Sequence, residues 1–143
     1  MKLIEDMDKE KLRNDTNSHI CHVITLLSDI SYKLKEIGKK HDHTKEDYFD
    51  EFYDALNSGN INNSEWYEKH FTEERHHLLR KVPEDVNLLD VLEQIADCIA
   101  TGLIRGDGKI DYNYLKLSNE VLQNAYMNTA KMLENIMKER LNR

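Results

Sequence analysis

Apolar residues along this chain recur at intervals of three and four, the spacing that places them on one face of an α-helix. No segment alternates polar and apolar residues over a useful length, so the pattern predicts no β-strand. One proline, Pro83, and five glycines interrupt the pattern. The sequence therefore predicts an all-α protein, a helical bundle of about five to seven helices.

Capping residues indicate where the first helix begins and ends. Ser18, or Asp15 just before it, can cap a long helix that runs to about Ile37, with Gly38 near its end. A short extra helix is expected before it, over residues 3–12. Helical spacing predicts that the long helix buries one stripe, which consists of His19, Val23, Leu26, Ile30, Leu34 and Ile37.

The middle of the chain contains two further helix starts. Thr44 is a good cap for a helix rich in aromatic residues, which ends before an Asn-Ser-Gly-Asn break. Another helix is expected to begin near Ser64 and can restart at Thr72. Pro83 would stop it, because proline lacks the backbone N–H that a helix interior requires.

Two helices are expected in the last third of the chain. Asn87 can cap a helix from Leu88 to about Ile104, which the Gly-Asp-Gly turn at 106–108 would close. Ser118 would open the final helix. Its broad apolar face is expected to contain Val121, Leu122, Ala125, Tyr126, Met132, Leu133, Ile136 and Met137.

Length and composition predict a single domain over residues 1–143, because 39% apolar residues are enough for one core. No apolar segment reaches membrane-spanning length, and the acids near the start do not fit a signal peptide. A soluble, cytoplasmic protein without a membrane partner is expected. Two cysteines, Cys21 and Cys98, lack zinc-knuckle spacing and are expected to be small buried residues.

Charge argues against a long nucleic-acid partner. The formal net charge is −7 with histidines counted as neutral. Lysines and arginines are scattered among acids, so no basic stripe is available to hold a DNA or RNA backbone.

Five of the seven histidines lie in a compact series, and an isolated acid follows them in a later apolar segment. This order of nitrogen and oxygen donors is what a buried site for one or two metal ions requires. The candidate ligands are His19, His41, Asp42, His70, His76, His77 and Asp97.

His41 and Asp42 are separated from His19 by about six helical turns. They can share a site with His19 only if the helix breaks near Gly38 and the chain returns. Lys45, three residues after Asp42, would lie one turn away and can contact a substrate phosphate, although a solvated lysine is an equal alternative. His43 is expected to point elsewhere.

The second donor group leaves two arrangements open. If one helix is continuous from Ser64, then His70 and His77 lie two turns apart on one face. If the helix restarts at Thr72, His70 ends one element and His76 enters from the next. Asp97 is the only charged residue between Ile95 and Ile104, yet helical projection groups it with Asp90 and Glu93 on what looks like a solvated face.

The ordered series over residues 18–103 resembles the HD-domain metallohydrolase superfamily. It comprises the early histidine, the His41-Asp42 pair with Lys45 after it, His70, the His76-His77 pair, and Asp97 in Ile-Ala-Asp-Cys. The local phrases around His19, His41 and Trp66 look most like small HD-like proteins often encoded by bacteriophages. The resemblance implies an HD-like domain with a metal-site core over about 18–104 and a C-terminal packing helix over about 118–141.

The resemblance implies that one divalent ion is bound by four residues of this chain, His19, His41, Asp42 and Asp97, with Asp42 bridging to a second ion. His70 and either His76 or His77 bind a second; Mn, Fe, Co, Ni and Zn all remain open. The implied activity is hydrolysis of a nucleotide or another small phosphoester by metal-activated water, with Asp42 and Lys45 at the reaction centre. A phage protein of this kind would act in the host cytoplasm. An HD-fold di-iron oxygenase and a non-catalytic binder with a structural metal are the alternatives.

Overall fold

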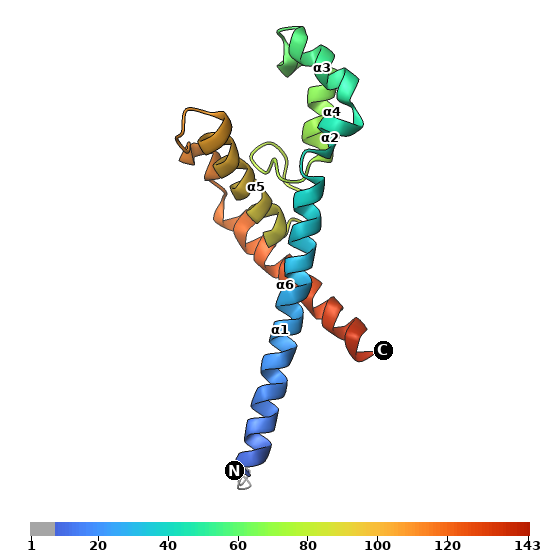
Figure 1. Ribbon diagram of the computed structural model, residues 1–143, viewed down its shortest axis with the longest axis vertical. Coiled ribbons are helices and arrows are strands. Elements are labelled where there is room, and N and C mark those ends of the chain that lie inside the picture. The colour runs from blue at the N-terminus through green and yellow to red at the C-terminus, as the bar shows by residue number, and fades with distance from the viewer. Residues whose placement is uncertain (1–7) are drawn as a thin grey trace.

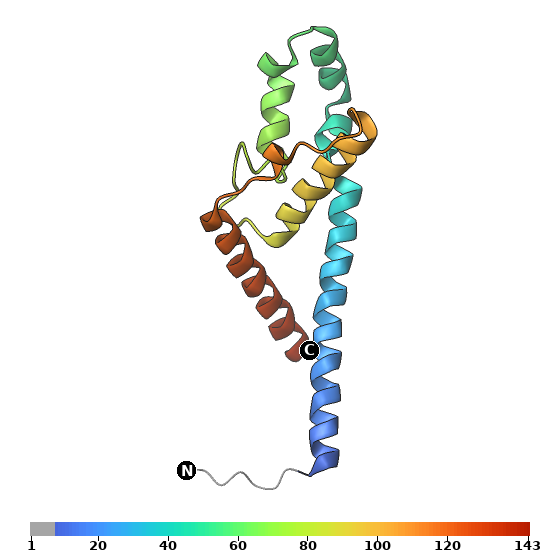
Figure 2. The same cartoon turned by 90° about the vertical axis from the view of Figure 1, so that its left-hand side faces the viewer.

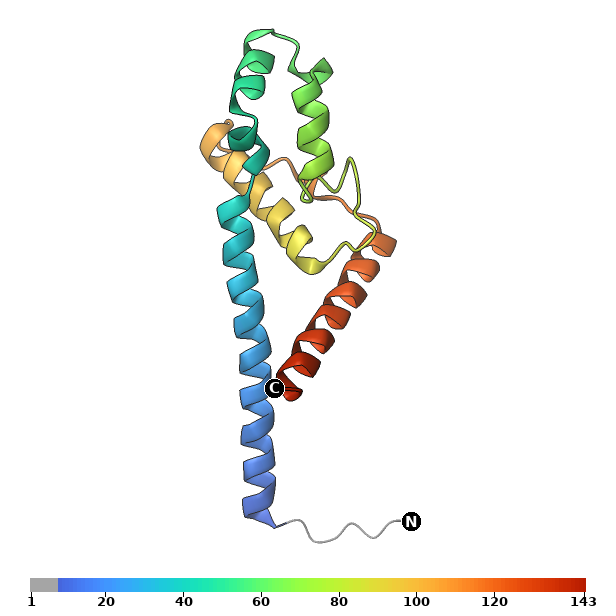
Figure 3. The same cartoon turned by 90° about the vertical axis from the view of Figure 1, so that its right-hand side faces the viewer.

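The computed structural model describes residues 8–143. Helices and connecting turns account for these residues, with no strand among them, which confirms the all-α prediction. The longest helices are α1 (Lys9–Lys40) and α6 (Asn119–Leu141), labelled in Figure 1. They diverge like the arms of a V (Figures 2 and 3). α5 (Leu88–Ala100) lies across the wide end of the V and contacts both arms (Figure 3).

α1 is longer than the caps predicted. It begins after Asp8, whose carboxylate accepts a hydrogen bond from the Glu10 amide at 3.1 Å, so the expected start at Asp15 or Ser18 is wrong. The expected short helix over 3–12 merges into α1 from Lys9 onward, and its earlier part lies outside the described residues. The stripe of α1 that was expected to be buried is only partly buried. No residue of α1 is fully buried, and His19 and Val23 are exposed.

Three short helices follow α1: α2 (His43–Asp47), α3 (Phe49–Asn57) and α4 (Glu65–Glu73). A 3-10 turn at Ile61–Asn63 joins the last two. Ser64 caps α4 as predicted, since its hydroxyl accepts a hydrogen bond from the Tyr67 amide at 3.1 Å. No restart occurs at Thr72, because α4 ends at Glu73 and the segment after it is irregular.

A buried tryptophan holds this upper part together. Trp66 is 3% exposed, and its indole ring lies 4.4 Å from the ring of Phe52 on α3, measured between centroids. Its Nε1 donates a hydrogen bond to the carbonyl of Thr44 on α2 at 3.3 Å. α2, α3 and α4 are thereby fixed relative to one another, which matters because α2 and α4 both supply residues to the site.

The helix boundaries in the last third follow the predictions. Asn87 and Asp90 form a capping box at the start of α5, and Ser118 caps α6. A π-helical turn at Thr101–Arg105 follows α5, and a 3-10 turn at Tyr112–Leu115 precedes α6. Among residues 8–143, no helix is long and apolar enough to cross a membrane.

A small hydrophobic core joins α5, α6 and the irregular segment before α5. Its buried members are Leu78, Val86, Val91 and Ala125. The thiols do not belong to it: Cys21 is exposed on α1 and Cys98 is half-buried, so the expectation that both are buried is wrong. The core therefore leaves most of α1 without hydrophobic support.

Candidate metal centre

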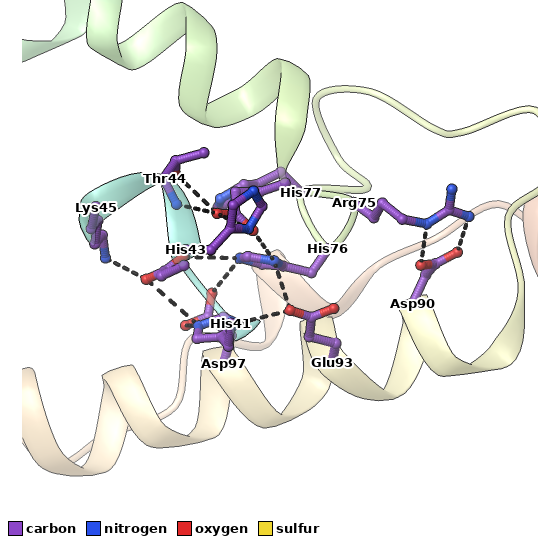
Figure 4. Close-up of polar contacts among 12 residues, drawn as sticks. His41, His43, Thr44, Lys45, Arg75, His76, His77, Asp90, Glu93 and Asp97 are labelled. Carbon is purple, nitrogen blue, oxygen red and sulfur yellow. Dashed lines mark hydrogen bonds and ion pairs between the residues drawn. The ribbon is translucent and has the colours of Figure 1, made fainter. Parts of the chain in front are cut away.

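The centre begins where α1 ends. Asp42 adopts a left-handed backbone conformation, with φ 55°, and it is the only non-glycine residue of the described chain that does so. Such a conformation costs free energy unless the surroundings enforce it, and it is common at functional sites. Here it turns the chain sharply between α1 and α2, so that His41 lies beside Glu93 and Asp97 of α5 (Figure 4). Asp42 lies near His70 of α4.

The second part comes from the end of α4 and the irregular segment after it. His70 lies in the last turn of α4 and is buried, while His76 and His77 follow in the irregular segment. An ion pair anchors this segment: the Arg75 guanidinium donates to both carboxylate oxygens of Asp90, at 2.8 and 2.9 Å. The second of the two arrangements left open is therefore close to the structure, although His76 enters from a loop rather than from a restarted helix.

α5 supplies two acids, Glu93 and Asp97, one helical turn apart on the same face. Sequence reasoning assigned Glu93 to a solvated surface together with Asp90, and the structure corrects both assignments. Asp90 is 3% exposed and caps α5, while Glu93 faces the histidines (Figure 4). The i, i+4 spacing of Glu93 and Asp97 was the signal that could have identified it.

Two imidazoles and two carboxylates converge at the first ligand group. The Nε2 atom of His41 lies 3.3 Å from Asp97 Oδ1 and 3.6 Å from Asp42 Oδ2. The Nε2 atom of His76 lies 3.5 Å from Asp42 Oδ1 and 3.6 Å from Asp97 Oδ2. These distances exceed the usual N–H···O length of about 2.9 Å. They match the spacing of about 3.4 Å between neighbouring ligands of a tetrahedral ion with bonds near 2.1 Å.

Glu93 lies on the opposite side of the same two imidazoles. Its Oε1 atom is 2.9 Å from Nδ1 of His41 and 3.2 Å from Nδ1 of His76. A carboxylate that accepts the Nδ1 proton of a histidine orients the other ring nitrogen toward a metal. Glu93 is placed to orient His41 in this way, and it is also close enough to both rings to be counted with them as a potential ligand.

A second ligand group consists of Asp42, His70 and His77. The Nε2 atoms of the two histidines are only 2.8 Å apart, and Nε2 of His70 lies 3.8 Å from Asp42 Oδ1. Asp42 thus lies between the two groups and has an oxygen near each. From this position Asp42 could contact an ion in each group.

Thr44 determines which nitrogen of His70 faces Asp42. Its hydroxyl donates to Glu74 Oε1 at 2.9 Å, so it can only accept from Nδ1 of His70, which lies 2.7 Å away. The Nδ1 atom of His70 must then carry the proton. The lone pair of Nε2 is left directed at Asp42 and His77, which is the state in which imidazole binds a metal.

His76 is a buried histidine whose ring nitrogens lack hydrogen-bond partners in the described chain. Its side chain is 1% exposed, and both ring nitrogens lack a hydrogen bond to any described residue. The Nδ1 atom is near Glu93 but is poorly aligned with it. Buried polar atoms without partners cost about 1–3 kcal/mol, a cost that a bound cation would remove. The donor set fits a divalent transition metal, because it combines imidazoles with carboxylates.

The electrostatics of the centre lead to the same conclusion. Four acids, Asp42, Glu74, Glu93 and Asp97, surround the histidines, and Lys45 is the one fixed cation that pairs with them in the described chain. Asp97 and Glu93 raise the pKa of His41 to about 10. The protonated ring of His41 lowers the pKa of Asp97 to about 2. The acids therefore draw a positive charge into this position, which a metal ion would supply.

Burial has the opposite effect deeper in the centre. It lowers the pKa of His77 to about 4. Burial also lowers the pKa of His70. Both rings are therefore neutral near pH 7, as ligation requires.

Three further side chains, Lys45, His43 and Arg80, lie around the ligand groups. Lys45 pairs through Nζ with Asp42 Oδ2 and is half-buried (Figure 4). His43 turns away and lies 3.0 Å from Glu74. Arg80 stacks over the ring of Phe71, 4.3 Å from its centroid, and pairs with Glu68.

His19 is the one candidate ligand that the structure does not bring to the centre. It is exposed on α1, and the helix continues without a break to Lys40. Twenty-two residues of helix place it about 33 Å from His41 along the axis. Within one chain His19 therefore cannot join the centre, whereas His41, Asp42, His70, His76, His77 and Asp97 lie together.

Comparison of the chain with known protein families, with curated proteins and with solved structures finds no match. The geometry of the centre is therefore the basis for assigning a function.

Proposed function

We propose that this protein is a metal-dependent phosphohydrolase that acts on a nucleotide or another small phosphoester. The observation that carries the proposal is His76, a fully buried histidine whose unpartnered ring lies among Asp42, Asp97 and Glu93. The order of donors that resembles the HD superfamily supports the same activity.

The two ligand groups define how the ions would be held. His41, His76, Asp42 and Asp97 would hold one ion, and Asp42, His70 and His77 would hold another, with Asp42 shared. When bound, a divalent ion lowers the pKa of coordinated water and neutralises charge on phosphoryl oxygens. Glu93 and Thr44 keep the imidazoles in the tautomers that ligation needs.

A pocket of about 580 Å³ opens beside the ligand groups. His76, His77 and Asp97 form part of its wall, so a substrate in the pocket would face the centre. The cations Arg80 and Lys109 also line it, as do Phe71 and Tyr114. Aromatic and apolar walls suit a nucleobase and the cations suit phosphate, which supports a nucleotide as substrate.

Lys45 would stabilise the negative charge that develops on the phosphoryl group of the substrate during the reaction. Its ammonium reaches the centre through Asp42 without being a metal ligand. In a site that excludes water, one such contact to a developing phosphoryl charge is worth about 3 kcal/mol, or roughly a hundredfold in rate.

The test is a screen of nucleotides and small phosphoesters with the purified protein and Mn, Fe, Co, Ni or Zn. Lys45→Ala should retain metal and lose about a hundredfold in kcat. Lys39→Ala is the matched control, since Lys39 also pairs with an acid three residues earlier, Glu36, but lies on exposed α1. Its turnover should equal that of the wild type.

Absence of turnover with every metal would overturn the hydrolase proposal. Bound iron with an oxygen-dependent change in absorbance would then favour the oxygenase. Equal turnover by Lys45→Ala and Lys39→Ala would instead place Lys45 outside the reaction centre.

A further inference from the structure

The N-terminal half of α1 extends beyond the rest of the molecule (Figures 1 and 3). Every residue from Lys9 to Ile24 is exposed. α6 reaches α1 at Asp29, whose carboxylate accepts hydrogen bonds from Arg140 at 2.6 and 2.9 Å. Between this ion pair and the exposed segment only Thr25 and Leu26 are half-buried.

An unsupported helix of this length is difficult to maintain in water. Most helical stability in proteins comes from packing of an apolar face, and every residue in the first half of α1 is exposed. This segment exposes large apolar side chains that no described residue covers. They are Ile20 at 48%, Val23 at 41%, Ile24 at 57% and Leu27 at 61%.

The total surface also indicates a missing partner. The chain exposes 11224 Å², whereas a folded monomer of 16.9 kDa is expected to expose about 7,700 Å². Full exposure of the seven residues outside the described range would account for about 1,200 Å². About 2,300 Å² of excess surface remains on each chain, which is at the upper end of the roughly 1,000–2,500 Å² that each subunit of an obligate homodimer buries.

The apolar positions of α1 form a regular seam. They alternate at spacings of three and four over three heptads, which is the pattern of helices that pack along their length. The upper half is half-buried and lies near the chain's own α5 and α6; the lower half is exposed. The seam residues are Ile20, Val23, Leu27, Ile30, Leu34 and Ile37.

We propose that a second copy of this chain packs antiparallel along the α1 seam to form a twofold symmetric dimer. The seam is complementary to itself in this direction, because the six positions form three pairs related by one centre. Ile20 faces Ile37 of the partner, Val23 faces Leu34 of the partner, and Leu27 faces Ile30 of the partner. The same residues then form both sides of the interface, as twofold symmetry requires.

The register gives the exposed lower half of each α1 a partner in the half-buried upper half of the other. α5, which contacts α1, exposes Leu92 at 47% and Ile95 at 40%, and these can extend the interface. In this register His19 of one chain lies level with Gly38 of the partner, three residues before His41. The dimer would thus bring a further imidazole to the edge of each centre.

Sedimentation velocity on the full chain tests the association. The wild type should sediment with twice the 16.9 kDa of one chain at micromolar concentration. Leu27→Glu places a charge in the central layer and should weaken the dimer about a hundredfold or more. Ser28→Glu adds the same charge one residue away, off the seam, and should remain dimeric. A monomeric wild type, or a Leu27→Glu variant as dimeric as Ser28→Glu, would overturn the proposal.

Disulfide trapping tests the direction and does not depend on a destabilised variant. In a Cys21→Ser, Cys98→Ser background, Val23→Cys mixed with Leu34→Cys should oxidise to a crosslinked heterodimer. Val23→Cys alone should not crosslink, because the two copies of residue 23 lie about 16 Å apart along the axis, beyond the reach of a disulfide. Efficient crosslinking of Val23→Cys alone would show a parallel pair and contradict the register.

Discussion

At the scale of single residues, Thr44 links the two helices that frame the centre. It is fully buried; its hydroxyl and its amide both donate to Glu74, and its hydroxyl accepts from His70. No charge or metal donor marks this residue in the sequence. Its role follows from the hydrogen bonds alone, since they determine the tautomer of His70.

Thr44→Val keeps the shape of the side chain and removes the hydroxyl. The metal-free variant should lose about 1–3 kcal/mol of unfolding free energy, because Glu74 and His70 lose a buried partner. Metal affinity should fall about 10- to 100-fold, as is usual when a residue that orients a ligand is lost. Urea unfolding and metal titration measure both. Thr16→Val, in exposed α1, should change neither; identical behaviour of the two variants would contradict the role of Thr44.

The sequence indicated which residues carry metal-binding atoms. It did not indicate as well which of these side chains point toward the same position in the folded chain. His41, Asp42, His70, His76, His77 and Asp97 could be proposed from residue type and order. Glu93 could not be separated from Asp90, since both lie on the polar side of one helix and only the packed loop shows which faces the histidines. His19 was misplaced because the break in α1 comes at Asp42 rather than at Gly38.

At the scale of elements, capping chemistry was predictable because it is local. Ser64, Asn87 and Ser118 each accept hydrogen bonds from the first turn of the helix that follows, as their sequence positions indicate. The start of α1 was not predictable in this way, because several polar residues compete to cap a largely exposed helix. The irregular course of 74–87 depends on long-range contacts such as Arg75 to Asp90.

Two glycines provide a matched test of how the pocket wall is built. A Cβ on Gly102 would lie 2.5 Å from the Lys109 carbonyl oxygen, whereas a Cβ on Gly38 meets nothing within 4 Å. Gly102→Ala should therefore lower the unfolding free energy by about 1–3 kcal/mol and displace Lys109 from the pocket. Gly38→Ala should raise it by up to about 1 kcal/mol. Chemical denaturation measures both, and equal shifts would contradict the close approach.

At the scale of the whole molecule, two features stand out: the negative charge gathered around the histidines and the large exposed surface of α1. The formal net charge is −7, and four of the acids lie around one cluster of histidines. One or two divalent ions would offset much of this local charge. The excess surface on α1 is a separate feature, which a second copy of the chain would cover.

Metal analysis by mass spectrometry, on protein purified without chelators and then incubated with Mn, Fe, Co, Ni or Zn, tests the central claim most directly. The wild type should retain one or two ions per chain after desalting. His76→Gln should lose at least one of them, because His76 has no other partner for its ring nitrogens. His22→Gln, an exposed histidine on α1, should bind as the wild type does. A wild type that retains none of these metals, or a His76→Gln variant with unchanged content, would contradict the metal centre.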